Sequence, residues 1–205
     1  MNKLFLYLHR RSREEKFRVF QRMMKPTADM RILNVGASGA NLALSEQFET
    51  HYTYRSQIVG GGISFSEAQD YRRSFPGVKA AVFDGCALPF PDKSFDIVFS
   101  NAVIEHLPGW EAQQKFATEM MRVGRGWFVT TPNLLYPVEP HYHLPLVQFL
   151  PQQSQRKLVK RIGKVPYDNL YLLTKRRLRQ LFPRGRVVGC RVTFYSETLI
   201  AYREP

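Results

Sequence analysis

The fold of this chain is decided by residues 88–107, which read LPFPDKSFDIVFSNAVIEHL. The apolar run over residues 95–100 is typical of a buried strand. Asn101 and Ala102 follow this run, at the carboxyl end of the predicted strand. In an open parallel sheet, ligands bind outside the carboxyl ends of the strands. We therefore expect the chemistry of this chain to lie just after such strands.

Four more apolar runs flank this stretch, over residues 31–36, 57–60, 78–83 and 126–131. Helices are predicted between the runs, over residues 40–48, 65–74 and 110–123. Buried strands that alternate with helices indicate βαβ units, right-handed crossovers and a largely parallel sheet. Two later runs, 186–193 and 197–202, are joined by a tight connection and predict an antiparallel pair at the edge of the sheet.

The 205 residues are predicted to form one α/β domain with two additions. Residues 1–29 contain a basic amphipathic helix, over residues 3–24, which Pro26 ends. Residues 132–170 hold six prolines, which leave little room for long elements, so we interpret them as an inserted lid or substrate segment with a short helix near 152–162. Thr174 is the predicted N-cap of a helix over residues 175–182.

Residues 88–107 resemble, nearly residue for residue, the LPFPDxSFDxVxSxxVxEHL signature of class I S-adenosylmethionine-dependent methyltransferases of the type 11 branch. They follow a glycine turn, a second strand and an Asp-bearing third strand end in the expected order, and the likeness covers about residues 30–133. The resemblance implies a Rossmann-like, doubly wound sheet of about seven strands, with helices on both faces and the last strand antiparallel. It also implies S-adenosylmethionine as the cofactor and methyl transfer as the reaction.

The resemblance further implies which residues contact the cofactor, at four strand ends. The methionine part would lie on Asn34, Gly36, Ser38 and Gly39. The ribose would lie beside Gly62, Ile63 and Ser64, and the sulfonium end beside Asn101 and Ala102. Asp84 would accept a hydrogen bond from the adenine amino group, and Gly85 and Cys86 would shape the adenine slot.

Three positions depart from the usual pattern of the family. Asn34 stands in place of an aspartate, Ser38 and Ala40 stand in place of glycines, and Gly62 stands in place of an acidic residue that grips both ribose hydroxyls. Each charge-assisted bond of such a carboxylate is stronger than a neutral one by roughly 1 kcal/mol. We therefore expect weaker cofactor binding unless a nearby side chain substitutes. The candidates are Ser64, Ser66 and Glu67.

Catalysis of methyl transfer depends mainly on alignment, and a general base is needed only where the acceptor must lose a proton. His106, in the signature, is one candidate base, with a helix-capping role as the alternative. Glu139, His141 and His143 alternate in a proline-rich stretch and point to one side if it is extended. Such residues also ligate zinc or iron. The prolines favour a substrate-facing loop, so we predict catalytic roles for Glu139 and His141 and no metal.

The net charge of +13 is concentrated in the two flanks of the chain. Residues 1–31 hold nine Lys and Arg against three acidic residues, residues 152–205 hold thirteen against three, and the middle holds eight against eleven. Basic flanks indicate an anionic partner or a solvated surface. The two cysteines form no CxxC pair, and no apolar run approaches the roughly 20 residues of a membrane span, so we expect a cytoplasmic protein. The basic amphipathic helix over residues 3–24 allows peripheral contact with a membrane.

Three functions fit these observations. The first is an S-adenosylmethionine-dependent methyltransferase with a small-molecule or glycan- or lipid-linked acceptor. The basic flanks allow this acceptor to be anionic. The second is an RNA-directed methyltransferase that binds phosphates through the basic flanks. The third is a non-catalytic binding or scaffold protein with the same fold, located at a membrane through residues 3–24.

Overall fold

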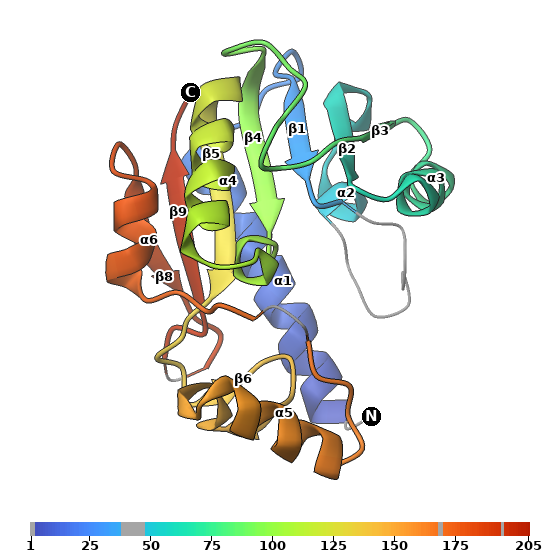
Figure 1. Cartoon of the computed structure of the whole chain (residues 1–205). Coiled ribbons are helices and arrows are strands. Elements are labelled where there is room, and N and C mark those ends of the chain that lie inside the picture. Colours follow the sequence, from blue (N-terminus) through green and yellow to red (C-terminus); the bar gives the residue numbers. More distant parts are fainter. Residues whose placement is uncertain (1–2, 38–47, 168–169, 194) are drawn as a thin grey trace.

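Seven strands form one sheet, in the order β3-β2-β1-β4-β5-β9-β8 (Figure 1). The computed structural model describes residues 3–37, 48–167, 170–193 and 195–205, and for residues 3–6, 8 and 9 only the backbone. The strands are β1 (Ile32–Val35), β2 (Ile58–Gly62), β3 (Lys79–Val82), β4 (Phe95–Asn101), β5 (Gly124–Pro132), β8 (Arg186–Cys190) and β9 (Thr198–Arg203). The pairs among β1 to β5 are parallel, and β9 runs antiparallel to both β5 and β8. The predicted doubly wound α/β fold with an antiparallel last strand is confirmed.

Six α-helices accompany the sheet in the described part of the chain: α1 (Lys3–Met24), α2 (Phe48–His51), α3 (Phe65–Ser74), α4 (Trp110–Val123), α5 (Gln152–Arg161) and α6 (Lys175–Leu181). The hydroxyl of Thr174 accepts the backbone N–H of Arg177 at 3.3 Å, as expected of an N-cap. The helix predicted over residues 40–48 lies outside the described residues, apart from Phe48. None of the described helices combines the length and apolarity needed to cross a bilayer.

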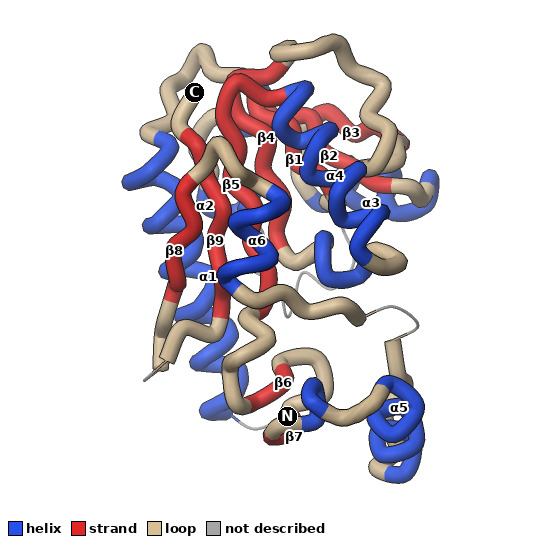
Figure 2. The backbone as a smooth tube through the Cα atoms, turned by 60° about the vertical axis from the view of Figure 1, so that its left-hand side comes forward, coloured by secondary structure: helices blue, strands red, loops and turns tan. Residues whose placement is uncertain are grey.

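The two faces of the sheet are covered by different helices (Figures 1 and 2). Side chains alternate along β1: Leu33 and Val35 belong to a core with α4 and α6, whereas Ile32 belongs to a core with α1 and α3. Phe20 of α1 is fully buried, and its ring lies 5.3 Å from that of Phe128 on β5. Burying a side chain of this size contributes about 2–3 kcal/mol. The second half of α1 is therefore docked on the sheet.

Residues 133–167 extend beyond the carboxyl ends of β4 and β5, at one end of the molecule (Figure 2). They contain the short hairpin β6 (Val138–Glu139) and β7 (Leu144–Pro145), a 3-10 helix over Val147–Phe149, and α5. Tyr142, Val147 and Val159 form a small core of their own. The segment thus holds itself together and places the tip of the hairpin, residues 140–143, near the ends of the sheet strands.

Candidate active site

The ends of β1, β2 and β3 meet at one edge of the sheet. The backbone N–H of Gly36 donates to the carbonyl of Gly61 at 2.8 Å, and that of Phe83 donates to the carbonyl of Gly62 at 2.9 Å. A Cβ added to Gly62 would lie 3.9 Å from Cα of Gly36. Gly36 itself has φ of +83°, a conformation that favours glycine. The predicted glycine turns are therefore neighbours in space.

Asp84 lies beside these turns, immediately after β3. Its side chain is exposed, and Oδ1 accepts the backbone N–H of Cys86 at 2.8 Å, which shapes the turn. A Cβ added to Gly85 would lie 3.0 Å from Cγ1 of Val35, so this turn packs directly against β1. One carboxylate oxygen is used by the turn, and the other is available to a ligand.

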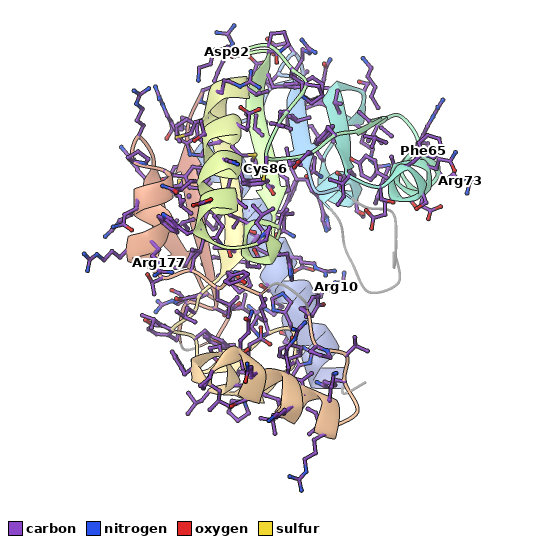
Figure 3. The ribbon with its side chains drawn as sticks, viewed as in Figure 1. Arg10, Phe65, Arg73, Cys86, Asp92 and Arg177 are labelled. Atoms are coloured by element: carbon purple, nitrogen blue, oxygen red, sulfur yellow. The ribbon has the colours of Figure 1, made fainter. Side chains whose placement is uncertain are left out.

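Cys86 is directed toward α4 (Figure 3). Its thiol donates to the carbonyl of Ala112 at 3.5 Å. Burial, with the nearby charge of Asp84, raises the pKa of the Cys86 thiol, which disfavours the reactive thiolate. Cys86 therefore packs the turn after β3 and does not act as a nucleophile.

The end of β4 carries two unusual features. Asn101 Oδ1 accepts two hydrogen bonds, from Oγ1 of Thr130 at 2.7 Å and from Nζ of Lys16 at 3.0 Å. Ala102 has φ of +56°, which costs a non-glycine residue about 1–2 kcal/mol. Its N–H donates to the carbonyl of Thr130 at 3.0 Å, which holds the strained backbone on β5. Such outliers cluster at functional sites.

Glu139 and His141 form a hydrogen-bonded pair at the tip of the β6–β7 hairpin. Oε1 of Glu139 lies 2.6 Å from Nδ1 of His141, and Oε2 accepts the backbone N–H of Tyr142 at 2.6 Å. Burial alone would raise the pKa of Glu139, but the hydrogen bond and charge of His141 and the N–H of Tyr142 outweigh it and lower that pKa. A carboxylate only accepts hydrogen bonds, so Nδ1 carries the hydrogen and Nε2 is the basic nitrogen.

His106 joins this pair from the 3-10 helix Ile104–His106, which follows β4. Its ring lies 4.9 Å from that of His141 in an edge-on arrangement, and both rings lie 5.0 Å from the ring of Tyr167. The three predicted catalytic residues, His106, Glu139 and His141, are thus brought together from two segments of the chain.

Glu105 is a further candidate that the sequence did not single out. Its side chain is fully buried, Oε2 accepts the hydroxyl of Thr131 at 3.0 Å, and no described residue pairs with Oε1. Burial raises the pKa of Glu105 to about 7. Ligand atoms of Glu105, His106 and His141 lie within 4.8 Å of one another and could hold a metal ion. This donor set differs from Glu139, His141 and His143, which the sequence suggested as ligands and which we predicted to bind no metal.

A pocket of about 350 Å³ lies between α1, the ends of β4 and β5, and the β6–β7 hairpin. Asn101 and Ala102 line one side of it, and His141 and His143 line another. Lys16, from α1, and Glu197, from the turn before β9, also line it. The residues predicted at the sulfonium end and the predicted base therefore face the same hollow. Nothing in the local sequence around Lys16 indicated this position, because α1 reaches the site only through tertiary packing.

Comparison with known proteins relates part of the chain to a known family and the whole chain to known folds. The family model described as Methyltransferase domain, of type 11, matches residues 33–129. A protein of Pyrococcus horikoshii OT3 has a similar structure, with a TM-score of 0.62 and 17% identity over 95% of this chain and 90% of that one. An S-adenosylmethionine-dependent methyltransferase of Thermotoga maritima has a TM-score of 0.61 and 14% identity over 98% and 94%. Residues 33–129 thus match the methyltransferase family, and the chain shares the fold of solved S-adenosylmethionine-dependent methyltransferases.

Among curated relatives, an uncharacterized protein of Mycobacterium tuberculosis H37Rv is 32% identical to this chain over 54 residues. The matched stretch is 26% of this chain and 18% of that protein. This chain therefore matches less than a fifth of the length of that relative.

The cofactor of this family fits the described strand ends. Gly62 carries no side chain beside Cα of Gly36, which leaves the backbone open to a ligand at this point, and the exposed carboxylate of Asp84 can accept a hydrogen bond from an amino group. Ser38 and Gly39 lie outside the described residues. Ile63 is 78% exposed next to Gly62. Gly36, Gly62 and Asp84 would hold the cofactor, with Ile63, Gly85 and Cys86 around the ribose and adenine.

The departures from the family pattern have structural counterparts. Asn34 is buried, and its amide donates to Oε1 of Glu49 at 2.5 Å, an oxygen that also accepts the hydroxyl of Tyr71 at 2.6 Å. Asn34 thus belongs to an internal network. Ser64 caps α3, since its hydroxyl accepts the N–H of Glu67 at 3.3 Å, and it also bonds Ser66. Glu67 is exposed in the first turn of α3 and is the candidate for the acidic residue that binds the ribose hydroxyls.

Proposed function

We propose that this chain transfers a methyl group from S-adenosylmethionine to an O–H or N–H group of a small-molecule or glycan- or lipid-linked acceptor, which loses its proton to His141. The observation that carries the proposal is that His141, paired with buried Glu139, lines the same pocket as Asn101 and Ala102. A base oriented by a buried carboxylate is of use when the acceptor must be deprotonated.

The residues have separate tasks in this reaction. The bound cofactor supplies a methyl group that its sulfonium already activates for displacement. Gly36, Gly62 and Asp84 bind and orient the cofactor from the ends of three strands. Nε2 of His141 takes the proton of the acceptor heteroatom as that atom forms its bond to the methyl carbon, while the sulfur–methyl bond breaks and its electron pair stays on the sulfur of the departing S-adenosylhomocysteine. Glu139 stabilises the resulting imidazolium through Nδ1–H.

Calorimetry with S-adenosylmethionine and S-adenosylhomocysteine tests the proposal. We expect binding in the micromolar range. Absence of heat at millimolar ligand would contradict the proposal and would favour the non-catalytic scaffold, for which cofactor affinity is not needed.

The RNA-directed alternative predicts salt-dependent retention of RNA on nitrocellulose filters. Figure 3 shows Arg10, Arg73 and Arg177 on three separate elements, α1, α3 and α6, and these charges do not gather at one place. Absence of retention at low salt would remove this alternative.

A further inference from the structure

Lys16 connects the N-terminal helix to the methyl-transfer end of the site. Its Nζ donates to Oδ1 of Asn101, 85 positions away in the sequence, at 3.0 Å. Arg13 lies one helical turn earlier, on the same side of α1, and lines the same pocket. Two cationic side chains of α1 therefore contribute to the wall opposite the β6–β7 hairpin.

The ammonium group of Lys16 is partly buried and forms no ion pair among the described residues. Its hydrogen bond goes to a neutral amide oxygen, which already accepts the hydroxyl of Thr130. The carboxylates that attract it, Glu105 and Glu197, are engaged elsewhere. Oε2 of Glu105 accepts the hydroxyl of Thr131, and Oε2 of Glu197 accepts the N–H of Val192 at 3.2 Å. Buried ammonium groups are usually paired, so this arrangement requires an explanation.

The surroundings of Lys16 weaken its hold on the proton, and a bound anion would strengthen it again. Burial and the nearby charge of Arg13 lower the pKa of Lys16 to about 8. Among the described residues that line the pocket, Glu197 is the one carboxylate, and Arg13 and Lys16 are the Arg and Lys side chains. His141 also lines the pocket and is paired with Glu139. Lys16 thus has no paired carboxylate among the described residues that line the pocket. A ligand with a negative group would supply the missing counter-charge.

We propose that Lys16, with Arg13, binds an anionic group of the methyl acceptor, a carboxylate or a phosphate. The inference rests on the proposed function and adds the class of acceptor. Much of the remaining wall is apolar, formed by Pro132, Val138, Pro140 and Val192, so the acceptor carries the anionic group on an apolar body. Since Nζ of Lys16 is bonded to Asn101, the anion lies close to the atom that receives the methyl group.

Three probes with the same ring separate charge from shape: 2-naphthoate, 2-naphthyl phosphate and the neutral 2-naphthamide. Their dissociation constants are measured on the full chain, with S-adenosylhomocysteine present, by ligand-observed NMR. We expect at least one anionic probe to bind about tenfold or more tightly than the amide. A preference for naphthoate identifies a carboxylate site, and a preference for the phosphate identifies a phosphate site. Equal binding of all three probes would overturn the inference.

Substitutions in α1 assign the preference to Lys16. Lys16→Met, similar in length and uncharged, should abolish the preference for the anion and leave binding of the amide unchanged. Lys16→Arg should keep most of the preference. The matched control is Arg22→Met, which removes an exposed charge from the last turn of the same helix and should change nothing. An equal loss for anion and amide in Lys16→Met would indicate a purely structural role and would contradict the inference.

Failure of this inference is distinguishable from failure of the proposed function. Binding of S-adenosylhomocysteine without any preference for anions would leave the methyltransferase proposal standing and remove the anion site. Preference for anions without cofactor binding would retain the anion site and remove methyl transfer.

Discussion

Oε1 of Glu139 lies 2.6 Å from Nδ1 of His141, across the tip of a short hairpin. The carboxylate is fully buried, and its second oxygen is held by the N–H of Tyr142. Glu139 therefore has little freedom to leave the imidazole, and the ring keeps Nε2 as its basic nitrogen. Both residues lie within residues 139–142 of the hairpin, so the pair belongs to a single short segment of the chain.

Loss of the base should reduce turnover more than binding. We expect His141→Gln to lower kcat by roughly 100-fold or more, the scale of general base catalysis. Glu139→Gln should lower kcat by about 10- to 100-fold, because the imidazole loses its orienting charge. The measurement is S-adenosylhomocysteine formed with 3-hydroxy-2-naphthoate as trial acceptor. His51→Gln, on α2, is the control. Full kcat in His141→Gln would show that the acceptor needs no base.

Asp84 should contribute to cofactor affinity in proportion to one buried hydrogen bond. We expect Asp84→Ala to weaken binding of S-adenosylhomocysteine by about 1–3 kcal/mol in calorimetry. Asp84→Asn should cost less, because its carbonyl oxygen can still accept the N–H of Cys86. Asp92→Ala serves as control, since Asp92 is exposed and pairs with Arg122. An unchanged affinity in Asp84→Ala would mean that adenine is bound elsewhere.

Much of the fold could be predicted because its signals are local. The bounds of α1, α3 and α4 agree with the predicted 3–24, 65–74 and 110–123, since caps, prolines and apolar periodicity act within a few residues. Parallel pairing also follows from the alternation of strands and helices. It places Gly36, Gly62 and Asp84 at neighbouring strand ends, where the resemblance expected them.

The remaining features depend on contacts that the sequence does not reveal. The bond between Lys16 and Asn101 needs α1 to dock on β5 and β8, and no local pattern encodes that docking. The resemblance implies that Asn34 contacts the methionine part of the cofactor, and it does not reveal that the buried partner of Asn34, Glu49, comes from a helix 15 positions later. Glu105 is visible in the signature, but its burial beside His141 depends on how the 133–167 segment folds back.

Gly36 allows a test of backbone geometry that is independent of catalysis. A Cβ at this position would lie 2.3 Å from Cγ2 of Val103, and φ is +83°. We expect Gly36→Ala to lower the free energy of unfolding by about 2–4 kcal/mol, from strain and overpacking together. Urea denaturation measures the change.

Gly109 provides the matched control for that test. Its φ is +85°, but an added Cβ would meet nothing within 4 Å. Gly109→Ala should therefore show the conformational cost alone, about 1–3 kcal/mol. Adding Val103→Ala to Gly36→Ala should relieve the clash. The double variant should therefore lose less free energy of unfolding than the sum of the losses in the two single variants. Equal losses in the two glycine variants would contradict close packing at Gly36.

Glu105 should make the stability of the protein depend on pH in the opposite direction to an ordinary ion-paired carboxylate. Burial raises its pKa to about 7, above the 4.5 of an unperturbed glutamate. Between these values the folded protein binds a proton that the unfolded chain releases, so stability falls as pH rises from 4.5 to 7. The full loss is about 3 kcal/mol. Glu105→Gln imitates the protonated acid, so we expect it to exceed the wild type in stability by about this amount at pH 8 and to match it near pH 4.5. Urea denaturation at both pH values, with exposed Glu67→Gln as control, measures the difference. A gain of the same size at both pH values would show that the carboxyl group of Glu105 does not titrate in this range.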